Sequence, residues 1–129
     1  MEKILGIGGF FFRARDPKAL ARWYADHFGI AEVPQDYDTP GWRQSGGTTV
    51  FAPFDHDTDY FGDPDKQWMI NFRVGDLDAM VKQLLSADIA VEVDAEVYPN
   101  GRFARLVDPE GNPIQLWQAS GISLESEEG

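Results

Sequence analysis

An internal repeat constrains the fold of this 129-residue chain more than any other feature of its sequence. Residues 12–19 read FRARDPKA, and residues 72–79 read FRVGDLDA sixty positions later. In each copy an apolar segment ends at an aspartate that can cap a helix, and a helical pattern follows. An isoleucine-alanine pair follows each helix, at positions 30–31 and 89–90. The sequence therefore predicts two structurally equivalent halves.

The two helices are predicted from their caps and from apolar residues spaced three and four apart. Asp16 is the expected N-cap of the first helix, Pro17 takes its first position, and Gly29 ends it. Asp76 is the expected N-cap of the second helix. The apolar stripes are Leu20, Trp23, Tyr24 and Phe28 in the first helix, and Leu77, Met80, Val81, Leu84 and Leu85 in the second.

Strand-like segments follow each helix, bounded by proline, glycine and asparagine. They are residues 31–33, 42–44 and 48–54 in the first half, and residues 90–98, 102–107 and 114–118 in the second. With the strand that precedes each helix, each half is predicted to be a βαβββ module. The length allows one domain, residues 1–119, with modules at about 4–54 and 67–118, a linker at 55–66, and an acidic tail at 120–129.

Alternation along the strands separates two faces, because side chains two residues apart share a face. One face is apolar and is expected to lie beneath the helices; it carries Phe10, Phe12, Ala14, Val50, Ala52, Ile70, Phe72, Val74, Ile114 and Leu116. The other mixes aromatic and polar side chains: Gly9, Phe11, Arg13, Thr49, Phe51, Met69, Asn71, Arg73, Gln115 and Trp117. An apolar wall with a few convergent polar groups is typical of a ligand-binding cavity. A wet sheet face that binds nothing specific is the alternative.

The chain is strongly acidic, with a formal net charge of −11 and no cysteine. Such a surface repels nucleic acid and anionic membranes, and no apolar run is long enough to span a membrane, so neither is an expected partner. The acidity favours cationic or neutral ligands, or simply keeps the protein soluble. The missing cysteines, and a first segment without the pattern of a secretory signal, lead us to expect a cytoplasmic protein.

Two motifs resemble the vicinal oxygen chelate superfamily, which includes glyoxalase I, extradiol dioxygenases, fosfomycin-resistance proteins and bleomycin-binding proteins. One is GRFARLVDPEGNPIQLW at residues 101–117, and the other runs from residue 12 to the Trp23-Tyr24 pair. The resemblance covers about residues 4 to 118. It implies an α+β fold in which two βαβββ modules form curved mixed sheets around a cavity, with the helices on the outer face. It also implies a homodimer.

The metal-binding members of that superfamily carry histidine or glutamate at four positions facing the cavity. The motifs place Gly9, Phe51, Met69 and Gln115 at these positions here. Hard divalent cations need carboxylate, imidazole or other oxygen ligands, which these residues do not provide as a set. We therefore expect a divergent member without the metal ligands and without a cofactor. The two histidines, in the first helix and in the linker, are not expected to replace them.

These observations lead to a first hypothesis, a metal-free protein that binds a small aromatic or cationic molecule. The cavity-face aromatics Phe11, Phe51 and Trp117 would supply stacking and cation–π contacts. Arg13 and Arg73 would instead favour an anionic group, unless they pair with nearby aspartates. A ligand with an aromatic body and an acid group would satisfy both observations.

The second hypothesis is a glyoxalase-like lyase, isomerase or dioxygenase-related enzyme with a non-standard active site. It requires a general base, for which Asp94, Glu96 and Tyr98 are the best candidates. A structural or regulatory module with an empty pocket is the third possibility. The sequence identifies neither a ligand nor a catalytic residue.

Overall fold

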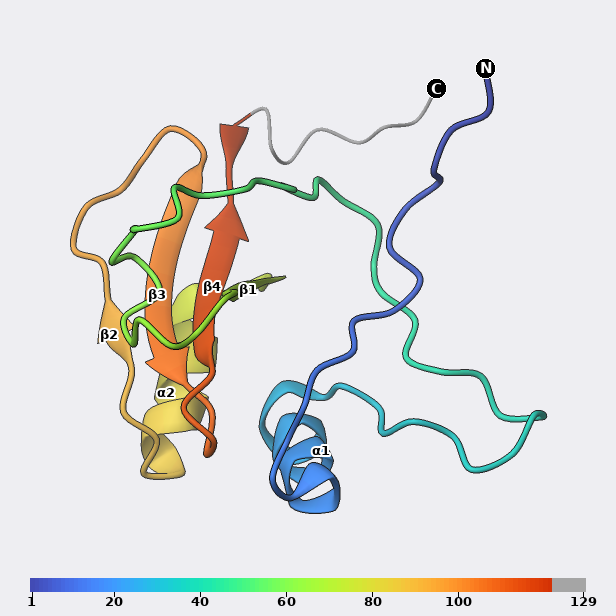
Figure 1. The fold of residues 1–129 in the computed structure, drawn as a ribbon. Helices are drawn as coiled ribbons and strands as arrows, with labels where there is room; N and C mark the ends of the chain where they lie inside the picture. Colours follow the sequence, from blue (N-terminus) through green and yellow to red (C-terminus); the bar gives the residue numbers. More distant parts are fainter. Residues whose placement is uncertain (122–129) are drawn as a thin grey trace.

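The computed structural model describes residues 1–121 and has an α+β fold, as the sequence predicts (Figure 1). The helices and strands follow in the order α1 (Pro17–Phe28), β1 (Ile70–Arg73), α2 (Leu77–Ser86), β2 (Glu92–Val93), β3 (Gly101–Val107) and β4 (Pro113–Ala119). The predicted acidic tail lies almost entirely outside the described residues. Within residues 1–121 neither helix is long and apolar enough to cross a membrane.

Both helices begin at the predicted caps. The Asp16 side chain accepts a hydrogen bond from the backbone N–H of Ala19, and the Asp76 side chain accepts one from Ala79, at 3.1 and 3.0 Å. Gly29 ends α1 with a φ of 70°, a left-handed conformation that glycine adopts without a steric penalty. The repeat therefore encodes its helices through local signals.

The second half forms a complete βαβββ module, β1-α2-β2-β3-β4. Its four strands make one sheet in the order β1-β4-β3-β2, with β1 parallel to β4 and the other neighbours antiparallel. The strand predicted at residues 90–98 is much shorter, since only Glu92–Val93 forms a strand beside β3 and Tyr98 makes an isolated bridge to Gly101. The mixed, curved sheet that the fold class requires is thus present.

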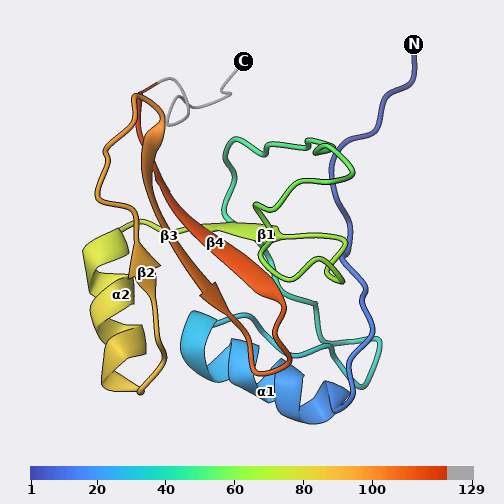
Figure 2. The same cartoon turned by 60° about the vertical axis from the view of Figure 1, so that its left-hand side comes forward.

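The helices cover one face of this sheet, the face that alternation predicts to be apolar (Figure 2). Ile114 and Leu116 of β4 are fully buried there, against Leu77 and Leu84 of α2. Helix α1 adds Leu20 and Tyr24 to the same core. One core therefore joins the helix of the first half to the sheet of the second.

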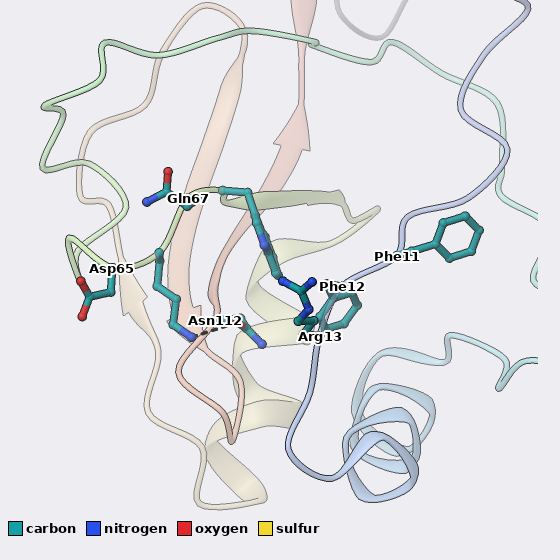
Figure 3. Close-up of a pocket in the computed structure, with 8 residues that line it drawn as sticks. Phe11, Phe12, Arg13, Asp65, Gln67 and Asn112 are labelled. Carbon is teal, nitrogen blue, oxygen red and sulfur yellow. Dashed lines mark hydrogen bonds between the residues drawn. The ribbon is translucent and has the colours of Figure 1, made fainter.

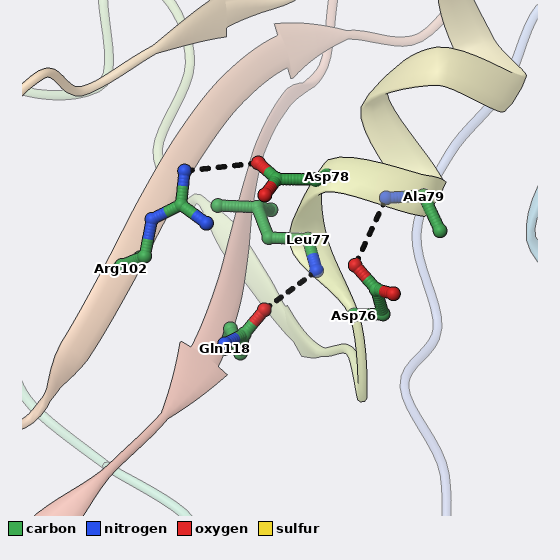
Figure 4. A network of polar contacts seen from close by, with 6 residues as sticks. All are labelled: Asp76, Leu77, Asp78, Ala79, Arg102 and Gln118. Atoms are coloured by element: carbon green, nitrogen blue, oxygen red, sulfur yellow. Dashed lines mark hydrogen bonds and ion pairs between the residues drawn. The ribbon is translucent and has the colours of Figure 1, made fainter.

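The start of α2 is fixed to the sheet by polar contacts (Figure 4). The backbone N–H of Leu77 donates to Oε1 of Gln118 on β4 at 2.7 Å, which satisfies one of the unpaired donors of the first helical turn. Asp78 accepts from Arg102 of β3 at 3.0 Å. These two contacts set the position of α2 across the sheet.

The turn between β3 and β4 holds α1 against the second half. The buried Asp108 accepts from the Tyr24 hydroxyl at 2.6 Å and from the Asn112 side chain at 2.7 Å. Glu110 accepts from the backbone N–H groups of Arg15 and Asp16, just before α1, at 2.6 and 3.0 Å. The Asp-Pro-Glu-Gly-Asn sequence, the most specific part of the family resemblance, thus connects the two halves.

Burial and the Asp108 contact raise the pKa of Tyr24 far above its ordinary value. A raised pKa stabilises the fold below the unfolded-state value of about 10, and this stabilisation is lost as the pH rises above it. We expect the free energy of unfolding to fall by about 1 kcal/mol more between pH 9 and 11 in the wild type than in Tyr24→Phe. Urea unfolding at both pH values checks this; parallel curves for the two proteins would contradict it.

The strands predicted in the first half are wrong for the single chain. The segments at residues 31–33, 42–44 and 48–54, and the one preceding α1, form no strand. A strand needs a neighbour for its backbone hydrogen bonds, and nothing in the described residues supplies one. Their apolar side chains remain exposed, notably Leu5, Phe11, Val33, Val50 and Phe51. The first half therefore contributes its helix to the core but no sheet.

Candidate functional site

Six side chains from three strands lie on the sheet face opposite the helices, and we call this set the polar face. They lie in two rows that follow the strand register. Asn71, Gln115 and Arg105 make the first row, and Arg73, Trp117 and Phe103 make the second. Directly opposed residues on neighbouring strands have their Cβ atoms about 5 Å apart, so each row is a contiguous surface. Four of the six were predicted from alternation: Asn71, Arg73, Gln115 and Trp117.

Residues 45–60 cross the polar face, and we call this segment the strap (Figure 1). In the first row, Gln115 accepts from the Asn71 amide and donates to the Tyr60 hydroxyl, both at 2.7 Å. The Arg105 guanidinium lies 4.6 Å from the centre of the Tyr60 ring and also donates to the Tyr60 carbonyl oxygen. Tyr60 thus contacts two of the three polar side chains in this row.

The second row combines an arginine fork with an aromatic pair. Arg73 donates from Nη2 to the Ser45 carbonyl at 2.7 Å and from Nη1 to the Gly46 carbonyl at 3.1 Å. Trp117 and Phe103 are stacked with their rings 6.1 Å apart and nearly parallel. The second row therefore places the Arg73 guanidinium on the same face as an aromatic pair.

Trp117 is more buried than its predicted place on a cavity wall suggests. It is 3% exposed, and its indole N–H donates to the carbonyl oxygen of Asn100 at 2.9 Å. The hairpin between β2 and β3, which contains Asn100, covers it. Trp117 is therefore part of the packing that shapes the face.

The alternative that Arg73 pairs with an aspartate is also corrected. The ion pairs among residues 1–121 are Arg22–Glu32 and Arg102–Asp78, so neither Arg73 nor Arg105 is bound to a carboxylate there. Glu92 is opposite Arg105 across the β2–β3 register but forms no ion pair with it. Both arginines contact neutral oxygens or a ring instead.

The five predicted site residues of the first half do not join the polar face. Gly9, Phe11, Arg13, Thr49 and Phe51 are exposed, and within residues 1–121 none makes a hydrogen bond or ring contact with the six face residues. The reason is the missing first-half strands, which alone would have fixed their direction. Met69, the remaining predicted residue, is half-buried just before β1.

Phe11 and Arg13 line a separate, open cleft of about 630 Å³ between the N-terminal segment, the linker and the β3–β4 turn (Figure 3). Its other lining residues are Phe12, Asp65, Lys66, Gln67, Trp68 and Asn112. Lys66 donates to the Asn112 side chain at 3.2 Å and to the Glu110 carbonyl at 3.3 Å. Phe11 points away from Asn112 in Figure 3. The cleft is lined by both aromatic and polar side chains and is open to solvent, so it encloses a ligand poorly.

The side chains at the four family positions for metal ligands do not fit a catalytic metal. Gly9 and Phe51 offer no ligand atom, and Met69 offers only a soft thioether. Both ends of the Gln115 amide are engaged, by Asn71 and by Tyr60. Elsewhere in residues 1–121, no three histidine, aspartate or glutamate residues are grouped closely enough to hold an ion.

The candidate bases lie at the edge of the sheet. The Tyr98 hydroxyl donates to Asp94 at 2.9 Å, and this hydrogen bond raises the pKa of Tyr98 to about 12. Tyr98 is therefore protonated at neutral pH and cannot act there as a base. Glu96 donates its backbone N–H to the same aspartate. These contacts make the group a hydrogen-bonded loop.

Three residues of the site were missed by sequence reasoning. Phe103 and Arg105 could have been found, because they alternate with Ala104 and Leu106 along a predicted strand. Tyr60 could not, because it lies in a segment without periodicity that we interpreted as a solvated linker. Its contacts depend on the path of the strap over the sheet.

Comparisons with known proteins identify the family. A model of the glyoxalase-like domain matches residues 9–117. The chain belongs to the glyoxalase-like domain family. The match includes both helices and the whole of the second module, apart from the end of β4. A search of curated protein sequences gave no match.

Solved structures with the same fold cover nearly the whole chain. TnmS3, an antibiotic binding protein from Streptomyces sp. CB03234, is 25% identical over 93% of this chain and all of its own, with a TM-score of 0.62. A glyoxylase/bleomycin resistance protein/dioxygenase domain from Frankia sp. EAN1pec is 19% identical over 92% of this chain and all of its own, with a TM-score of 0.58. The oxidase ChaP-H2 is 22% identical over 85% of this chain and 90% of its own, with a TM-score of 0.51. Proteins with different functions thus share this architecture.

Proposed function

We propose that this glyoxalase-like protein binds a small organic molecule on the polar face, without a resident metal ion. The observation that carries the proposal is the combination of donors from Asn71, Arg73, Arg105 and Gln115 with the stacked Trp117–Phe103 pair on one sheet face. Ligand sites combine apolar walls with a few polar groups in this way. The antibiotic-binding TnmS3, 25% identical, supports binding as the function.

Thermal shift measurements against a panel of aromatic antibiotics test the proposal. A ligand at one hundred times its dissociation constant adds about 2.7 kcal/mol to the free energy of unfolding. We expect Gln115→Leu, which removes two hydrogen bonds from the face, to weaken binding of any hit. Gln35→Leu, on an exposed segment outside the face, is the matched control. Equal binding by wild type and Gln115→Leu would remove the polar face as the site.

Metal removal gives an independent prediction. Because the four family positions offer no set of hard ligands, the purified protein is expected to contain no stoichiometric transition metal. Treatment with a chelator is expected to leave its melting temperature and its ligand affinity unchanged. Elemental analysis checks the first expectation, and one equivalent of zinc, nickel, manganese or iron would contradict the proposal.

We further propose that the protein is a homodimer in which a second copy covers the first half. The chain exposes 10278 Å², whereas a compact monomer of 14.5 kDa exposes roughly 6,900 Å². The excess is on the scale of the area that stable dimer interfaces bury.

The apolar side chains left open in the first half are suited to such an interface. Ile4, Leu5, Phe11, Val50 and Phe51 are each more than two-thirds exposed, which is unusual for so many large apolar residues in one chain. Sedimentation at tens of micromolar is expected to give twice the mass of the chain. A monomer at that concentration would contradict the dimer without affecting the assignment of the polar face.

A further inference from the structure

We infer that the ligand of the polar face is an aromatic acid, and that the strap occupies the acid's contacts when no ligand is bound. This inference rests on the proposed function and specifies the chemical class of its ligand. It follows from what the strap places on each group of the face.

The Arg73 fork is the first argument. Its Nη1 and Nη2 donate separately to two neighbouring carbonyl oxygens, of Gly46 and Ser45, at 3.1 and 2.7 Å. Two parallel N–H···O contacts of one guanidinium match the two oxygens of a carboxylate, which binds more strongly because it is charged. The strap therefore puts neutral oxygens where an acid would put charged ones.

Tyr60 is the second argument, because it contacts the first row as a substituted aromatic ligand would. Its ring lies under the Arg105 guanidinium, and its hydroxyl oxygen accepts from Nε2 of Gln115. An aromatic ring with an oxygen substituent can make the same two contacts. Tyr60 is 38% exposed, so it is only partly enclosed in this place.

The charge of the polar face is the third argument. It favours an anionic ligand, whereas the acidity of the whole chain favours a cationic or neutral one. The net charge is −11, yet the two arginines of the polar face lack a carboxylate partner in residues 1–121. The acidic groups nearest along the sheet are Glu92, opposite Arg105, and Asp94, which already accepts from Tyr98 and Glu96. The strap also carries Asp55, Asp57 and Asp59, and within residues 1–121 none of them forms an ion pair with Arg73 or Arg105. Two unpaired arginines favour an anion here over a cation.

The strap is suited to leave the face when a ligand binds. It has no regular secondary structure, and residues 45–47 are exposed. Segments with few buried contacts open at low free-energy cost. The backbone of Gly47 also lies so close to Arg73 that a Cβ there would collide with the guanidinium. The missing Cβ of Gly47 thus allows the strap to approach Arg73 this closely.

A matched series of three probes tests the class of ligand: 2-naphthoate, 2-naphthamide and 2-naphthylmethylammonium, which share one ring system. Titration calorimetry is expected to show that the acid binds at least tenfold more tightly than the amide, with the ammonium weakest. Arg73→Gln is expected to abolish the preference for the acid over the amide. Arg22→Gln, which removes an exposed arginine of α1, is the control and should keep it.

The outcomes separate this inference from the proposed function. If the amide or the ammonium binds as tightly as the acid and Gln115→Leu weakens both, the face binds ligands but the acid inference is overturned. If no probe binds at millimolar concentration, or Gln115→Leu changes nothing, the proposed site fails as well.

Tyr60→Ala tests the role of the strap. It frees Arg105 and Gln115, so the acid is expected to bind several-fold more tightly than to the wild type. Weaker binding would overturn the strap as a competitor and would make Tyr60 part of the ligand contact. Circular dichroism of the variant establishes that the sheet is intact.

Discussion

Replacing Asp108 with alanine is expected to lower the free energy of unfolding by about 3–5 kcal/mol. The carboxylate is 2% exposed and accepts four hydrogen bonds. They come from the Tyr24 hydroxyl, the Asn112 side chain, and the backbone N–H groups of Glu110 and Asn112. Each buried donor left without a partner costs about 1–3 kcal/mol, and the costs are not fully additive. Typical domains are stable by about 5–15 kcal/mol, so this is a large share.

The loss of stability in Asp108→Ala is expected to come from the contact between the two halves. Tyr24 belongs to α1, whereas Asp108 begins the turn between β3 and β4, so the variant removes a hydrogen bond that joins the first helix to the sheet. Urea unfolding measures the change, and hydrogen exchange locates it in α1 and in this turn. Asp57→Ala, which removes an exposed carboxylate from the linker, is the matched control and is expected to change stability by less than about 0.5 kcal/mol. A similar small effect of Asp108→Ala would contradict the connecting role of the turn.

The helices and the second module could be predicted because their signals are local. Asp16 and Asp76 cap helices whose backbone bonds lie within the same segment, so each cap needs only its own neighbours. The alternation of Ile114 and Leu116 with Gln115 and Trp117 specified which side chains meet the helices. In β4 a single strand carries both patterns, and the structure confirms them.

The first-half strands could not be assigned from sequence because a strand is stabilised by a partner that its own sequence does not contain. Residues 48–54 show the alternation of a strand, yet Val50 and Phe51 are exposed in the single chain. Local propensity was therefore not sufficient. Since these segments were expected to complete the cavity, the same failure leaves Thr49 and Phe51 exposed and away from the polar face.

In the candidate site, too, the residues with local signals were predicted and those placed by long-range contacts were not. Asn71 and Gln115 were predicted separately from two strands, and the parallel register of β1 and β4 brings them into a hydrogen bond. Tyr60 joins them only because the strap folds back over the sheet, a long-range event with no local signature. Sequence thus specified the face and missed the segment that covers it.

Replacing Trp117 with alanine is expected to cost about 3–5 kcal/mol of stability, since the side chain is 3% exposed. The variant loses the stacked contact with Phe103 and leaves a cavity beneath the β2–β3 hairpin. It also leaves the Asn100 carbonyl without its indole donor. Urea unfolding measures this change. A loss below about 1 kcal/mol would contradict the packing role of Trp117.

A second variant separates packing from binding at this position. Trp117→Phe keeps an aromatic ring beside Phe103 but removes the N–H that donates to Asn100, so its expected cost is about 1–2 kcal/mol. Because the polar groups of the face are unchanged, folded Trp117→Phe is expected to retain the preference for 2-naphthoate over 2-naphthamide, which arises from Arg73. If the preference for 2-naphthoate disappears while the fold is intact, the Trp117 side chain contacts the ligand beside its carboxylate. If it persists, the aromatic pair shapes the surface on which the arginine acts.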